Sequence, residues 1–75
     1  MHAHSRIATL TRMAPGDRVY FEAPAGRLAA LQSQITVDIH RAGLRGLVTL
    51  ERVIAVAPRT LETVDLVRAT RLPSN

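Results

Sequence analysis

Arginine is the residue type in this sequence best suited to do chemistry. There are ten arginines and no lysines against six acidic residues, and the formal charge is +4. A guanidinium group binds phosphate bidentately and stacks on bases. The coding bias of a GC-rich genome would also explain the missing lysine in a chain rich in alanine, leucine and valine. With either origin, this charge on so small a chain creates a positive field around it.

Five arginines and one tyrosine are our candidates for contacts with phosphate or with a partner. Arg41 and Arg45 flank the end of a predicted helix. If the last two strands pair, Arg52 lies near Arg68, and a basic stripe crosses the sheet. Tyr20, on the solvent side of its predicted strand, offers a stacking surface. The candidate binding residues are Arg41, Arg45, Arg52, Arg68, Arg71 and Tyr20.

The acidic residues offer a simpler interpretation of the same arginines. Glu51, Asp65 and Asp38 could balance them and leave ordinary solvated side chains. Asp38 and His40 are expected to be solvated on their helix, and Asp17 is expected to hydrogen-bond its own turn. Arginines clustered on one face would favour nucleic acid, whereas scattered arginines beside an exposed apolar patch would favour a protein partner.

No set of residues predicts a metal site or a catalytic site. His2 and His4 have a spacing that could touch a metal, but no third ligand is evident, and a polar chain end is the simpler interpretation. No serine–histidine–aspartate set or apolar-face carboxylate pair is supported by spacing. Gly43 and Gly46 indicate a helix stop and a turn, not a phosphate-binding loop. We therefore expect no enzyme, no metal and no cofactor.

Length and composition predict one small folded domain. Residues 1–75 are 47% hydrophobic, and we expect loose ends at 1–5 and 73–75. The lack of cysteine excludes disulfides and thiol catalysis and fits a reducing cytoplasm. Charged residues interrupt every long apolar window, so neither a membrane helix nor a signal peptide is predicted. So short a chain has a thin core, and a homodimer would add buried area.

Prolines and glycines divide the chain into predicted elements. Residues 5–13 carry an apolar residue at every third position and predict a short helix capped by Ser5, with an extended arm as the alternative. Pro15 and Gly16 predict a turn. Residues 18–22 alternate and are β-branched or aromatic, which predicts a strand with Val19 and Phe21 on one side.

Residues 27–42 have the clearest helical pattern. Their apolar residues are spaced by three or four positions, and Gly43 follows as a stop. The residues of this apolar face are Leu28, Leu31, Ile35, Ile39 and Ala42.

The last third of the chain predicts two strands that form a hairpin. Residues 47–56 alternate, with Val48, Leu50, Ile54 and Val56 on one face. Residues 61–72 favour a strand, although a helix capped by Thr60 is the alternative. A helix-turn-helix with 28–42 as its first helix and 49–56 as its recognition helix is a further alternative, but β-branched residues make 49–56 a poor helix.

Together these elements predict an α+β fold. A short N-terminal helix, a strand, a long helix and a β-hairpin would form a three-stranded antiparallel sheet with one helix packed on it.

The order of motifs resembles small basic proteins encoded by bacteriophages and prophages. The resemblance rests on the Pro15–Phe21 strand, one helix closing on Ala42–Gly43, and the terminal run Val67–Leu72. It implies a protein of the bacterial host cytoplasm that binds nucleic acid, or one that binds and inhibits a host protein.

Our leading hypothesis is a nucleic-acid-binding protein that acts through arginine–phosphate contacts, as a homodimer, on DNA rather than RNA. The alternative is a non-enzymatic modulator that binds an acidic surface of a host protein. Neither hypothesis involves a membrane.

Overall fold

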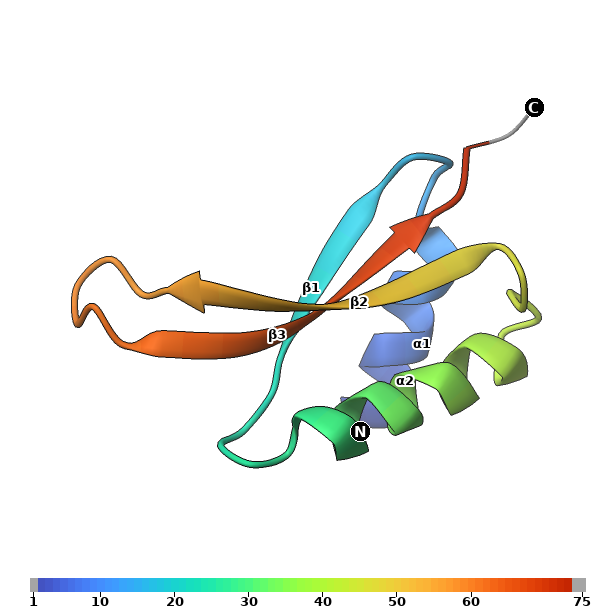
Figure 1. Cartoon of the computed structure of the whole chain (residues 1–75). Helices are drawn as coiled ribbons and strands as arrows, with labels where there is room; N and C mark the ends of the chain where they lie inside the picture. Colours follow the sequence, from blue (N-terminus) through green and yellow to red (C-terminus); the bar gives the residue numbers. More distant parts are fainter. Residues whose placement is uncertain (1, 74–75) are drawn as a thin grey trace.

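Two helices cover one face of a three-stranded antiparallel sheet in the computed structural model, which describes residues 2–73, with side chains from residue 6 onward (Figure 1). The predicted α+β class and element order are confirmed, and the helical alternatives for 49–56 and 61–72 are wrong. The elements are α1 (His2–Arg12), β1 (Arg18–Glu22), α2 (Leu28–Arg41), β2 (Val48–Val56) and β3 (Thr63–Arg71).

The last strand lies in the middle of the sheet. The strand order is β1-β3-β2, and β3 is antiparallel to both neighbours. β1 and β2 therefore run in the same direction, and α2 connects them across the helix-covered face while β3 fills the space between them.

The core lies between the two helices and the sheet. Leu10 of α1, Ile35 of α2 and Val67 of β3 are fully buried, and each comes from a different element. Val19 and Phe21 of β1 pack against the same cluster, as the alternation of their strand predicts. The apolar faces of the helices and strands thus pack together in one core.

Two local signals set the ends of elements as predicted. The Asp17 carboxylate accepts a hydrogen bond from the backbone N–H of Ala14 at 2.9 Å, which closes the turn before β1. Gly43 has φ of 74° and ends α2. The N–H of Leu44 donates to the carbonyl of Ile39 at 2.9 Å, and Leu44 is buried, which completes a helix-stop motif of the Schellman type.

α1 starts earlier than its apolar pattern predicted. It begins at His2, not at Ser5, and it is a helix, so the extended-arm alternative is wrong. The two predicted loose ends, 1–5 and 73–75, lie partly outside the described residues. Met1 of the first end and residues 74–75 of the second are not described. The side chains of His2 and His4 also lie outside the described part of the chain.

A buried ion pair joins the two helices, and it corrects one prediction. Asp38 is buried on the inner side of α2, not solvated, and its Oδ2 accepts a hydrogen bond from Arg6 Nε at 2.6 Å. The sequence pattern placed Asp38 outside the apolar stripe because it could not show α1 packing beside α2. His40, two residues on, is exposed as predicted.

Removing Arg6 should destabilise the fold. Arg6→Ala leaves the Asp38 carboxylate buried without its partner, and we expect the free energy of unfolding to fall by about 2 kcal/mol. Urea denaturation measures this change, with Arg12→Ala on the exposed side of the same helix as the control. A loss no larger than in the control would show that Asp38 is solvated in solution.

Candidate functional site

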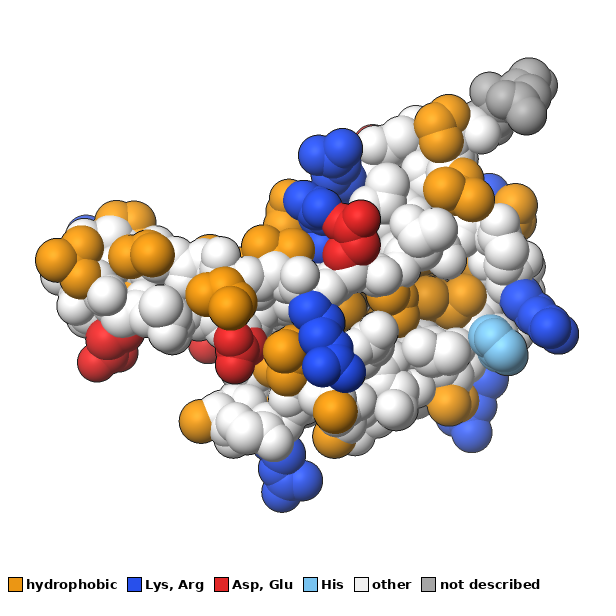
Figure 2. Space-filling view, viewed as in Figure 1, with side chains coloured by type: hydrophobic (Ala, Val, Ile, Leu, Met, Phe, Trp, Pro, Cys, Tyr) orange, Lys and Arg blue, Asp and Glu red, His pale blue; other side chains and the backbone are white. Residues whose placement is uncertain are grey.

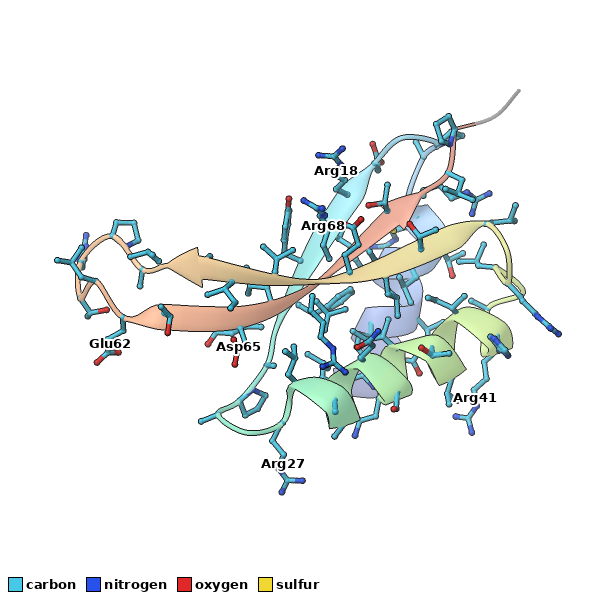
Figure 3. All side chains as sticks on the ribbon, viewed as in Figure 1. Arg18, Arg27, Arg41, Glu62, Asp65 and Arg68 are labelled. Carbon is cyan, nitrogen blue, oxygen red and sulfur yellow. The ribbon has the colours of Figure 1, made fainter. Side chains whose placement is uncertain are left out.

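The face of the sheet opposite the helices carries an arginine–tyrosine cluster. We call Arg18, Tyr20, Glu51 and Arg68 the open-face cluster. Arg68 lies directly opposite Tyr20 on one side and Glu51 on the other, and residues opposite each other share a face. Figure 3 shows Arg18 and Arg68 on the side of the sheet away from α2. The cluster therefore meets solvent and not the core.

An ion pair organises this cluster. Arg68 Nη2 donates a hydrogen bond to Glu51 Oε2. This bond and the charge of Arg68 hold the pKa of Glu51 below its ordinary value, and Arg18 adds to the effect. Glu51 and then Tyr20 raise the pKa of Arg68. Because Arg68 already has a carboxylate partner, Arg18 is the cation of this cluster that remains available to a ligand.

The predicted basic stripe does not form. Arg52 lies opposite Val67, so its side chain is on the helix-covered face, whereas Arg68 is on the open face. Its Nε donates a hydrogen bond to Gln32 Oε1 of α2 at 2.6 Å. The observed strand register differs by one residue from the register that a basic stripe requires. A shift of one residue moves every side chain of a strand to the opposite face of the sheet.

The remaining candidate arginines lie at other places on the molecule. Arg41 and Arg45 are exposed at the end of α2, as predicted. Arg71 is partly buried opposite Val48 and shares the helix-covered face. Figure 2 shows arginines from the open face to both ends of α2, not gathered in one patch. Of the six candidates, the structure brings together Tyr20 and Arg68.

β2 and β3 extend beyond the rest of the fold and form a hairpin arm, defined here as residues 54–65. β1 pairs with β3 only from Leu66 to Thr70. The nine residues of β2 span about 30 Å, whereas the five of β1 span about 17 Å and the 14 of α2 about 21 Å. Figure 1 shows the two strands projecting past β1 and α2 as a ribbon.

The hairpin arm exposes large apolar side chains. Ile54 is 71% exposed, Val56 58% and Leu61 77%. The sequence pattern placed Ile54 and Val56 on the same face as the buried Val48, which is correct, but α2 does not extend far enough to cover them. A nine-residue strand is longer in ångströms than a 14-residue helix. A comparison of these expected lengths would have shown that α2 cannot cover all of β2.

Leu61 has a backbone conformation that leucine rarely adopts. Its φ is 59°, in the left-handed region, and it is the one described residue other than glycine with a positive φ. Its N–H donates to the carbonyl of Ala57 at 2.9 Å, which holds the loop in this shape. Glycine or asparagine fits such a position at lower cost, so leucine here is unfavourable for the loop itself.

A shallow hollow lies where α2 begins. Its volume is about 210 Å³, and Pro24, Arg27, Ala30, Leu31 and Gln34 line it. This volume is below the range of about 300–1,000 Å³ usual for small-molecule sites. Among the described residues, no group of three or more histidine, aspartate or glutamate side chains is placed to hold a metal ion. None of the described helices has the length and apolar character needed to cross a membrane.

Comparisons with known proteins add no family or fold relative. No family model, no curated protein and no solved structure matches this chain. The resemblance to phage-encoded proteins therefore stays a prediction, and function has to be inferred from the surfaces described above.

The open-face ion pair should be visible in a pH titration. The pKa of Glu51 is lowered in the folded protein, so the ion pair stabilises the fold above the ordinary glutamate range and is lost as the pH falls through the lowered pKa. In Arg68→Ala, we expect the Glu51 carboxyl to titrate at higher pH, and carbon-detected NMR measures its midpoint. Arg59→Ala is the control; equal midpoints in both variants would show that the pair does not form in solution.

Proposed function

We propose that this chain is a non-enzymatic binding module that contacts a protein partner through its hairpin arm. The observation that carries the proposal is Leu61, which is 77% exposed and held at positive φ. An outlier of this kind costs about 1–2 kcal/mol and persists where the surrounding structure or a function requires it. In the loop of the arm, the leucine side chain has no internal role that would compensate for this cost.

The other exposed residues of the arm support the same proposal. Ile54 and Val56 are exposed and lie on the same face of β2 as Val48. The helices cover this face at Val48 but not at Ile54 and Val56. A two-stranded ribbon is marginally stable alone, and a long, apolar edge strand tends to pair with another chain. Contact with a protein surface would bury these side chains and stabilise the arm.

The distribution of arginines fits a protein partner better than a single nucleic-acid groove. Arg18 projects from the open face of the sheet and Arg41 from the end of α2 (Figure 3), whereas Arg52 lies on the helix-covered face. Scattered arginines beside an exposed apolar patch favour protein contact. If the resemblance to phage proteins holds, the partner is a protein of the bacterial host cytoplasm or of the phage itself.

Photo-crosslinking from the tip of the arm tests this proposal. A benzophenone amino acid in place of Arg59 should give a discrete adduct in bacterial cells, and the same probe in place of Arg41, exposed at the end of α2, should not. Leu61→Asn should remove most of the adduct while retaining stability or raising it by up to about 1 kcal/mol, because asparagine tolerates positive φ. Equal adducts from both probe positions, or no effect of Leu61→Asn, would argue against the arm as the contact.

Nucleic-acid binding is a second candidate because charge is unevenly divided along the chain. The arm has one arginine against two acidic residues, or −1, whereas the other residues have nine arginines against four acidic residues, or +5. Arg18 and Tyr20 on the open face add an available cation and an exposed ring. The residues outside the arm could contact phosphates without further aromatic side chains on which bases stack.

A salt series of fluorescence anisotropy with labelled duplex DNA tests this candidate. Each phosphate contact contributes about −0.9 to the slope of log affinity against log salt. If the residues outside the arm bind DNA, Arg18→Ala and Arg45→Ala should each reduce the magnitude of the slope by about 0.9. Arg59→Ala, on the arm, should leave it unchanged. A wild-type slope near zero would exclude phosphate contacts as the basis of function.

A further inference from the structure

We propose that the partner of the hairpin arm is a second copy of this chain, and that each arm docks in the hollow at the start of α2 of the other copy. This inference rests on the proposed function and names its partner. An arrangement in which the same two surfaces meet twice about a two-fold axis closes as a dimer.

The arm and the hollow are complementary in charge. Glu62 and Asp65 lie on the side of the arm toward which α2 lies, and Arg27 projects from the start of α2 (Figure 3). None of these three side chains makes an ion pair with another described residue of its own chain. In the proposed dimer, each Arg27 meets the acidic residues of the partner's arm.

The start of α2 lacks the groups that usually satisfy a helix N-terminus. Arg27 occupies the N-cap position and makes no capping hydrogen bond with its side chain, and the first turn has no acidic residue. The free backbone N–H groups and the helix dipole favour negative charge at this end. The carboxylates of an incoming arm would supply it, in addition to the pairing with Arg27.

The hollow and the arm are also complementary in character and size. Pro24, Ala30 and Leu31 give the hollow an apolar part, which lies beside Arg27 and Gln34. Its volume of about 210 Å³ is small for a cofactor and suits one aliphatic side chain, such as Leu61 at the tip of the arm. Both surfaces lie at the same end of the molecule, because α2 begins near the base of the arm (Figure 1).

The chain exposes more surface than a monomer of its mass is expected to, and the excess is about the area that a dimer would bury on each partner. Its accessible surface is 5456 Å², whereas a folded monomer of 8.2 kDa is expected to expose about 4,500 Å². The arm contributes to this difference of about 900 Å². A standard interface buries about 800 Å² on each partner.

The test is the oligomeric state of the whole chain in solution. Sedimentation equilibrium from about 1 µM to about 500 µM should give a species of twice 8.2 kDa, or 16.4 kDa. Arg27→Glu and Glu62→Arg should each weaken the dimer roughly tenfold, and the double variant should recover most of that loss. Arg41→Glu, which makes the same charge change at the other end of α2, is the matched control.

Three results would overturn the inference. They are a monomer throughout the concentration range, a dimer that Arg27→Glu and Arg41→Glu weaken equally, and a double variant no better than its single parents. Circular dichroism confirms that each variant folds, which is expected because these side chains are exposed. A monomer that still gives an arm-dependent adduct heavier than 16.4 kDa would exclude self-association and leave the proposed function intact.

Discussion

β3 holds the sheet together, because β1 and β2 each pair with β3 and not with one another. Val67 and Ala69 of this strand are fully buried, and they belong to the same core cluster as Leu10 of α1 and Ile35 of α2. β1 is near the start of the chain, so its pairing with β3 closes a loop of more than forty residues. The strand that organises the fold thus follows both of its neighbours in the sequence, so the sheet can form only after β3 (Thr63–Arg71) is available to pair with them.

The same strand produces the exposed arm. β2 and β3 match each other in length, but β1 and α2 are too short to accompany them to the tip. The result is a ribbon with apolar residues and open backbone edges, which natural proteins usually cover or protect with charge. Leu61 adds an unfavourable backbone conformation at the tip. These features are costly in an isolated chain and reasonable in one whose arm is normally covered.

Several arginines of this basic chain serve the fold. Arg6 neutralises a buried carboxylate and links the helices, and Arg68 pairs with Glu51 across two strands. Arg52 reaches from the sheet to Gln32 of α2. A formal charge of +4 therefore overstates how many guanidinium groups are available to a ligand. The arginines without such contacts point in different directions, which is why the arm, and not a basic patch, is the most distinctive surface.

Local pattern in the sequence determined the elements and their ends. The Pro15–Asp17 turn, the alternation of 18–22, the apolar spacing of 27–42 and the stop at Gly43 each act over a few residues, and each was confirmed within about one residue. For the same reason, the faces of Tyr20 and Phe21 could be predicted within their own strand. The extent of α1 was less accurate, because an N-terminal helix with few apolar residues has weak local signals.

Only the tertiary structure decided how these elements meet. The central position of β3, the register that separates Arg52 from Arg68, the burial of Asp38 beside Arg6 and the uncovered arm all depend on segments far apart in the chain. Periodicity shows which face of an element is apolar, but it does not show which partner covers that face or how far the cover extends. Those outcomes follow from strand pairing and from the relative lengths of neighbouring elements, which no short stretch of sequence contains.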